Sequence, residues 1–346
     1  MAQKKKKGKI LFTTLKVIVS VGLIAILIAQ MDLNALQKVL ASVTLWFLAL
    51  AVFFMFIELV LMSIRLYVLL LMKELHVPFF ILFKLNLVSV FVGIFLPSAL
   101  GFDALRVFYL SKHTNHVVDS ISLVTLDRFL NMVSITLFAI FSFFLGGYFR
   151  KLSGLWIAIL PMLFGIGFVF LFMSKRIRSF IRGALKRVRM PEKVINWIGS
   201  LVGSFYECRA FPRLLLLLFG LAIVFQATRT TTSYFFAQSV DIDVSFIYFF
   251  IIIPIVTVLS MLPFSIAGIG VPQYSSVYLF ELVGVDMESV LGFSIVIYVA
   301  RILITLPGLY FFYREGFDSL LQSVSKTKFF PFFKRRKVSM EVVKNT

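Results

Sequence analysis

Long apolar runs constrain the fold of this chain more than any other feature of its sequence. Six runs approach or exceed the roughly 20 apolar residues that cross a bilayer as an α-helix. We expect full membrane spans at residues 10–30, 43–72, 118–147, 152–174, 212–238 and 287–313. Because 60% of the 346 residues are hydrophobic, against about one half in a soluble domain, the sequence predicts an all-α polytopic membrane protein.

Two further apolar regions are interrupted by helix-breaking residues. The first covers residues 83–110 and contains Pro97 and Gly101. The second covers residues 244–283 and contains Pro254, Pro263, Gly268, Gly270 and Pro272. Proline removes a helical hydrogen bond, and the backbone groups freed in this way must find partners in protein or water rather than in lipid. We therefore expect two broken hairpins that line a cavity, and the sequence leaves open whether they re-enter or cross the membrane.

The net charge of +19 is concentrated in residues 4–9, 175–193 and 326–337. In a soluble protein this charge would suggest nucleic acid, but in a chain this apolar it follows the positive-inside rule. We expect no nucleic-acid partner and a multi-pass protein of the cell membrane with both termini in the cytoplasm. The basic segments also suit anionic lipid headgroups. The expected organisation is a basic N-terminus (1–9), a membrane domain (10–314) with a cytoplasmic loop (175–211), and a basic tail (315–346).

Two short motifs suggest an internal repeat. LPSALGF at residues 96–102 resembles LPFSIAGIG at residues 262–270, and each lies between two long spans. The charge rule places the two surrounding units, residues 43–147 and 212–313, in opposite orientations in the membrane. Inverted repeats with helices broken near the midplane are typical of secondary transporters.

The first broken region also carries a pair of opposite charges. Asp103 and Arg106 are three residues apart, so they lie on one side of the second half-helix. The N-terminus of that half-helix, near Ser98, favours an anion. We expect Arg106 to bind a phosphate, with Asp103 orienting Arg106 or pairing with it when the site is empty. A structural ion pair without a ligand is the alternative.

Several other charged residues fall inside predicted spans, where each costs at least about 2.5–3.5 kcal/mol at the bilayer centre. Their number predicts a polar interior, and arginine matches phosphate geometry better than lysine does. The candidate substrate-binding residues are Arg65, Pro97, Gly101, Asp103, Arg106, Asp127, Arg128, Arg229, Gly268, Gly270 and Arg301. Glu58, Asp103 and Asp127 are candidates for proton coupling.

The sequence also excludes several kinds of chemistry. Cys208 is the single cysteine, which excludes internal disulfides and thiolate metal sites. No G-x-x-x-x-G-K-[ST] motif is present, so ATP does not drive the protein directly. We expect no cofactor and no metal.

Three stretches resemble a known family. They are LPSALGFDALRVFYL, LVTLDRFLNMV at residues 123–133, and LPFSIAGIGV. They are similar to the flippase-like integral membrane domain, the membrane half of the lysylphosphatidylglycerol synthetase/flippase proteins. Its pattern G-x-D-x-x-R, followed by D-R, is matched by Gly101, Asp103, Arg106, Asp127 and Arg128. The resemblance extends from the first span to Tyr313 and implies a multi-span protein with re-entrant elements that handles phospholipids between leaflets.

The chain departs from that family at two places. Pro272 and Gln273 follow the second glycine motif, where the family often has Arg-Glu. The tail after the last span is about thirty residues long, too short for the soluble domain that attaches an amino acid to lipid. We therefore expect no aminoacyl-transferase activity.

The leading functional hypothesis is a phospholipid flippase or lipid transporter with an arginine-lined cavity. Its substrate would be an anionic or aminoacylated phospholipid, or a polyprenyl or glycolipid phosphate, moved downhill or by proton coupling. An intramembrane lipid-modifying transferase is one alternative, since paired carboxylates can act as acid and base, although no nucleophile–base pair is visible. A non-catalytic membrane partner of a lipid synthase is another. The partners considered are the lipid substrate, the membrane, a lipid synthase and a second copy of this chain.

Overall fold

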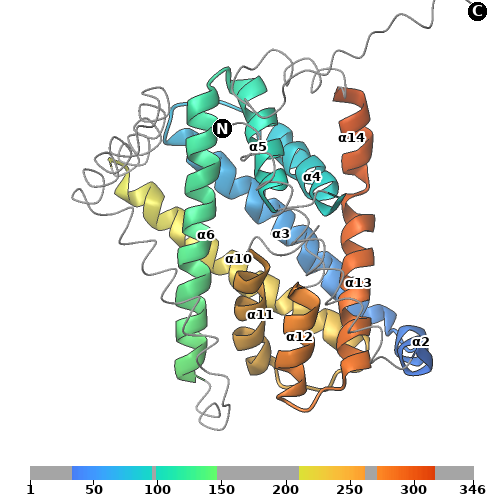
Figure 1. Cartoon of the computed structure of the whole chain (residues 1–346). Coiled ribbons are helices and arrows are strands. Elements are labelled where there is room, and N and C mark those ends of the chain that lie inside the picture. Colours follow the sequence, from blue (N-terminus) through green and yellow to red (C-terminus); the bar gives the residue numbers. More distant parts are fainter. Residues whose placement is uncertain (1–32, 96–98, 146–209, 262–270, 316–346) are drawn as a thin grey trace, which may run out of the picture.

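The computed structural model describes residues 33–95, 99–145, 210–261 and 271–315 of the chain (Figure 1). Within these ranges the regular structure is entirely helical. The helices are α2 (Leu33–Ala41), α3 (Leu45–Leu71), α4 (Phe79–Phe95), α5 (Ala99–Thr114), α6 (Val117–Leu145), α10 (Pro212–Ser239), α11 (Phe246–Met261), α12 (Val271–Glu281), α13 (Met287–Thr305) and α14 (Pro307–Glu315). The prediction of an all-α membrane protein is therefore confirmed.

Four helices are long and apolar enough to cross a bilayer, namely α3, α6, α10 and α13. They coincide with four of the six predicted spans. The other two predicted spans, residues 10–30 and 152–174, lie outside the described residues.

The last predicted span, residues 287–313, is wrong in its extent. Helix α13 ends at Thr305, and a separate helix α14 begins at Pro307. Proline has no amide hydrogen for the helical ladder, and its ring collides with the preceding turn, so an uninterrupted helix is disfavoured at this position. The second segment, α14, packs against α4.

Each interrupted region forms two helices, α4 with α5 and α11 with α12. The breaks themselves, residues 96–98 and 262–270, lie outside the described residues, and with them Pro97, Pro263, Gly268 and Gly270. Pro254 was expected to interrupt the second region but lies inside α11. Pro272 occupies the first turn of α12, where a missing amide hydrogen has no consequence.

The long helices α3 and α10 run side by side through the middle of the molecule and contact each other extensively (Figure 1). Figure 1 shows α4, α5 and α14 toward one end of these helices and α11 and α12 toward the other. In the contact pattern, α6 lies against α5, α10 and α11, while α13 lies against α12, α10 and α4. The two central helices thereby hold the two hairpins at opposite ends.

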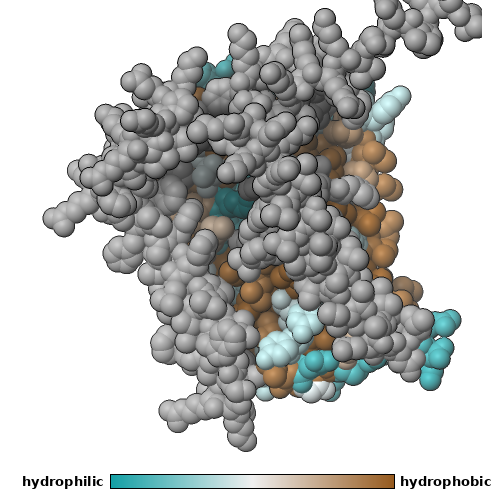
Figure 2. Space-filling model, in the orientation of Figure 1, coloured by the Kyte–Doolittle hydropathy of each residue, from teal (hydrophilic) through white to brown (hydrophobic). Residues whose placement is uncertain are grey.

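Two apolar clusters form the core. One gathers residues of α3 to α6, including Leu66, Leu110 and Leu123. The other gathers residues of α10 to α13 together with the first part of α3, including Phe249 and Phe280. Figure 2 shows hydrophobic residues over much of the described surface and a hydrophilic patch set back near the middle of this face. Among the described residues, several polar and charged side chains, including Arg65, Arg106 and Asp127, are buried inside the helix assembly.

The packing of α14 on α4 depends on Gly308. A Cβ atom at this position would lie 2.6 Å from the backbone oxygen of Leu87, whereas one at Gly220 would meet nothing within 4 Å. We expect Gly308→Ala to lower the free energy of unfolding by ~1–3 kcal/mol, because a backbone contact of this kind cannot rotate away. The measurement is thermal unfolding of the purified protein in detergent. Gly220→Ala is the matched control and should unfold at the wild-type temperature or above; an equal loss in both variants would contradict this packing.

Candidate functional site

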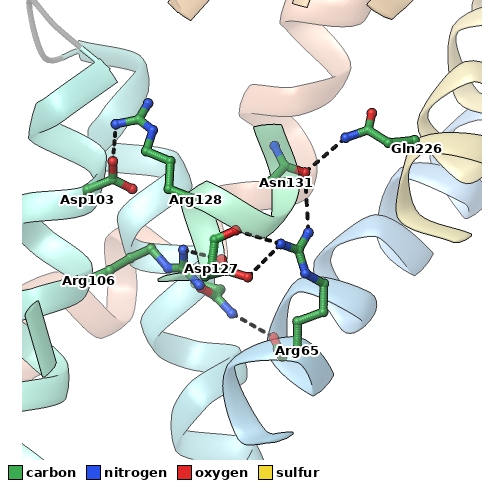
Figure 3. A network of polar contacts seen from close by, with 9 residues as sticks. Arg65, Asp103, Arg106, Asp127, Arg128, Asn131 and Gln226 are labelled. Carbon is green, nitrogen blue, oxygen red and sulfur yellow. Dashed lines mark hydrogen bonds and ion pairs between the residues drawn. The ribbon is translucent and has the colours of Figure 1, made fainter. Parts of the chain in front are cut away.

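Three helices meet at a buried pair of arginines that share one aspartate (Figure 3). On α3, Arg65 places Nη2 2.7 Å from Oδ1 of Asp127, and the same nitrogen donates to the Asp127 backbone oxygen at 2.9 Å. From α5, Arg106 donates through Nη1 to Asp127 Oδ2 at 2.9 Å. The exposed fractions of the three side chains are 3%, 3% and 7%. We call Arg65, Arg106 and Asp127 the arginine pair site.

This site holds two positive charges and one negative charge. Arg65 and Asp127 alone would form a balanced ion pair, so Arg106 supplies a surplus charge in a membrane-spanning region. Among the described residues, Nε and Nη2 of Arg106 and Nε of Arg65 have no hydrogen-bond partner. Buried polar groups are normally hydrogen-bonded, and the Nε–Nη2 edge is the fork with which arginine binds carboxylate or phosphate in two parallel bonds. The site can therefore accept an anion.

The expected pairing of Asp103 with Arg106 is wrong. Asp103 pairs with Arg128, and Arg106 pairs with Asp127, so both ion pairs join α5 to α6 (Figure 3). Asp127 and Arg128 are adjacent on α6, and side chains of neighbouring helical residues diverge by about 100°. Each consequently meets a different residue of α5.

Hydrogen bonds between two side-chain amides connect the arginine pair site to the second half of the chain. The Oδ1 atom of Asn131 accepts hydrogen bonds from Arg65 Nη1 at 3.3 Å and from Gln226 Nε2 at 2.9 Å (Figure 3). The ring of Phe225 lies 5.5 Å from the Arg65 guanidinium. The sequence interpretation missed Asn131, although its position one turn after Asp127 on α6 could have indicated it. These contacts hold Arg65 between α6 and α10.

A second polar contact, also missed from the sequence, lies between α3 and α4. Asn86 Nδ2 donates to Ser63 Oγ at 2.9 Å, and Ser63 Oγ donates to the Leu59 backbone oxygen at 2.8 Å. Asn86, Ser63 and Ser89 are all completely buried. The Asn86 Oδ1 and Ser89 Oγ atoms have no partner among the described residues. The only signal in the sequence was the occurrence of Asn86 and Ser89 within an apolar run.

Three predicted site residues form a separate group on α3, α10 and α13. The charge of Glu58 interacts with the guanidinium groups of Arg229 and Arg301, and Glu58 lies near Thr232. All three charged side chains are half-buried. The structure therefore divides the predicted intramembrane charges between two groups instead of bringing them into one.

Gly101 lies in the first turn of α5 rather than at the break, while Pro97, Gly268 and Gly270 lie outside the described residues. Within the described ranges no set of three or more His, Cys, Asp or Glu side chains could hold a metal ion.

The two aspartates of α5 and α6 should differ in their effect on stability. Asp127→Ala leaves two buried guanidinium groups uncompensated, which costs about 3–5 kcal/mol when one partner of a buried pair is removed. Asp103→Ala should cost less, because the side chains of Asp103 and Arg128 are 18% and 26% exposed and water can replace the carboxylate. Thermal unfolding of both variants in detergent measures the difference. Equal losses would contradict the assignment of Asp127 as the shared counter-charge.

Comparison with known proteins agrees with the resemblance seen in the sequence. Residues 13–308 match the family model described as the lysylphosphatidylglycerol synthase TM region. A search of curated proteins gave no significant match. The family match covers most of the chain, including all residues of the arginine pair site. The chain belongs to the lysylphosphatidylglycerol synthase transmembrane-region family.

Proposed function

We propose that this protein is a phospholipid flippase or lipid transporter, and that the arginine pair site receives the phosphate of the lipid headgroup. The observation that carries the proposal is the buried Nε–Nη2 edge of Arg106, which has no partner among the described residues. An arginine that only stabilised the helix assembly would have its donors satisfied by protein. Membership of a lipid-related membrane family supports the same substrate class.

In this proposal, the Asp127 carboxylate is the counter-charge of both arginines when no lipid is bound. Its two carboxylate oxygens each meet one guanidinium, at 2.7 and 2.9 Å. A phosphodiester also carries one negative charge and offers two equivalent oxygens, so it can occupy the free edge of Arg106 and compensate the surplus positive charge. Because the three side chains are buried, we propose that headgroup entry requires movement of the helices around them, as alternating access does in transporters with broken helices.

The proposed movement rests on an inverted repeat of α3–α6 and α10–α13. Both units contain a long helix, a helix pair and a second long helix. The contacts between the two units are reciprocal. The last helix of the first unit, α6, packs against α11 of the second unit, and the last helix of the second unit, α13, packs against α4 of the first. Movement would be downhill or coupled to protons through Glu58, Asp103 or Asp127.

Localisation and partners follow from the same proposal. The protein would lie in the cell membrane with both termini in the cytoplasm, and its substrate would be an anionic or aminoacylated phospholipid or another lipid phosphate. We further propose that the chain moves lipid without modifying it, since the carboxylates of Asp127 and Asp103 are each paired with an arginine. A lipid synthase or a second copy of this chain are the protein partners to test.

Removal of the surplus charge should abolish most of the transport. Arg106→Gln leaves a balanced Arg65–Asp127 pair, so folding is preserved, but the loss of a charged two-bond contact worth about 1.5–3 kcal/mol should slow headgroup exposure about tenfold or more. The assay uses phosphatidylglycerol with a fluorescent label on its acyl chain, in vesicles that contain the purified protein. It measures the rate at which added dithionite reduces the label.

The matched control is Arg213→Gln, which alters an exposed arginine in the first turn of α10. It should transport at the wild-type rate. A wild-type protein no faster than empty vesicles, or an Arg106→Gln variant as fast as the wild type, would refute the proposed function.

A further inference from the structure

We propose that Asn86 and Ser89 select the headgroup by accepting a hydrogen bond from it, so that the site takes a lipid phosphate whose headgroup carries a hydroxyl or ammonium donor. This inference rests on the proposed function and adds a specificity to it. The phosphate would occupy the free edge of Arg106, and the donor would reach the side chains of α4.

The orientation of the Asn86 amide is fixed by its neighbours. The Ser63 hydroxyl gives its single hydrogen to the Leu59 backbone oxygen at 2.8 Å, so Ser63 Oγ can only accept from Asn86, at 2.9 Å. The amide nitrogen must therefore face Ser63, and Oδ1 must face away from it. With the side chain completely buried, Asn86 Oδ1 is a fixed acceptor with no donor among the described residues.

The register of the α4–α5 hairpin places these acceptors beside Arg106. A Cβ atom on Gly93 would lie 3.3 Å from the Cβ atom of Phe102, so the two residues face each other. Ser89 and Arg106 are each four residues from this contact, one turn along the same helix faces. Asn86 follows Ser89 at the next turn of α4. Helices α4 and α5 contact each other, and Leu85 and Val88 of α4 and Leu105 of α5 belong to one core cluster.

Arg106, Arg65, Asn86 and Ser89 therefore supply buried hydrogen-bonding atoms of two complementary kinds. Arg106 and Arg65 present donors next to a surplus positive charge, and Asn86 and Ser89 present oxygen acceptors. A bare anion satisfies only the donors. A phosphate with a hydroxyl or ammonium group satisfies both, whereas a headgroup without a donor leaves Asn86 Oδ1 unpaired. Sites built to bond a ligand hydroxyl reject analogues that lack it far more strongly than apolar pockets do.

The test compares lipids of equal charge that differ in their donors. Phosphatidylglycerol is set against phosphatidylmethanol, and phosphatidylethanolamine against phosphatidylcholine, as acyl-labelled lipids in vesicles containing the full chain. We expect wild-type protein to move the donor-bearing member of each pair about tenfold faster. Asn86→Leu and Ser89→Ala should each reduce this preference, mainly by slowing the transport of the donor-bearing lipid. For Asn86→Leu the preference should fall to about twofold or less.

Ser134→Ala is the matched control, because Ser134 is a completely buried serine whose hydroxyl donates to the Leu130 backbone oxygen of its own helix. It should keep the tenfold preference. A wild-type protein that moves both members of each pair equally, or an Asn86→Leu variant that retains the preference, would overturn the inference.

A binding measurement separates this inference from the proposed function. Short-chain forms of the four lipids and inorganic phosphate, whose monoanion also carries hydroxyl donors, are tested for their effect on the thermal unfolding of the detergent-solubilised protein. Donor-dependent stabilisation by lipids that Asn86→Leu removes, without any transport, would support the site and refute the flippase. The same effect with inorganic phosphate alone would assign the site to free phosphate and overturn the lipid assignment. If no ligand shifts unfolding, the inference fails.

Discussion

The shared contact of Arg65 and Arg106 with Asp127 joins α3, α5 and α6 and determines the charge of the protein interior at this site. One carboxylate cannot balance two guanidinium groups, and in an apolar region the remaining charge has a high free energy. A protein that needed only an internal clasp between α3, α5 and α6 could have used one arginine. In the proposed function the second arginine meets a negatively charged ligand, and its Nε–Nη2 edge, which has no partner among the described residues, would fix the geometry of that contact.

The surrounding helices keep this contact in place while connecting it to both halves of the chain. Asn131 holds Arg65 and Gln226 together, and Gln226 lies one turn before Arg229 on α10. The central helices α3 and α10 thus carry residues of both charge groups, Arg65 with Glu58 on one helix and Gln226 with Arg229 on the other. A displacement of α3 relative to α10 would change both groups at once, which is the kind of coupling that a transporter requires.

The sequence predicted the four long apolar helices that the structure describes, and it identified charged residues within them, because apolar length and the cost of membrane-buried charge are local properties. It failed where the result depends on how helices pack. The spacing of Asp103 and Arg106 predicted a pair on one helix, whereas each found a partner on α6. Pro254 was compatible with a continued helix, and Pro307 was not. Asn86 and Asn131 carry no charge, so their place in an apolar run and one turn after Asp127 were weak signals, and their partners on other helices could not be read from the local sequence.

The most direct test of the central claim is an experimental density map of the full chain in nanodiscs that contain phosphatidylglycerol. We predict phosphate density within hydrogen-bonding distance of Nε and Nη2 of Arg106, in a conformation in which the headgroup has access to the site. Density that shows these two nitrogens bonded to protein groups in dry packing, with no lipid beside them in any conformation, would contradict it.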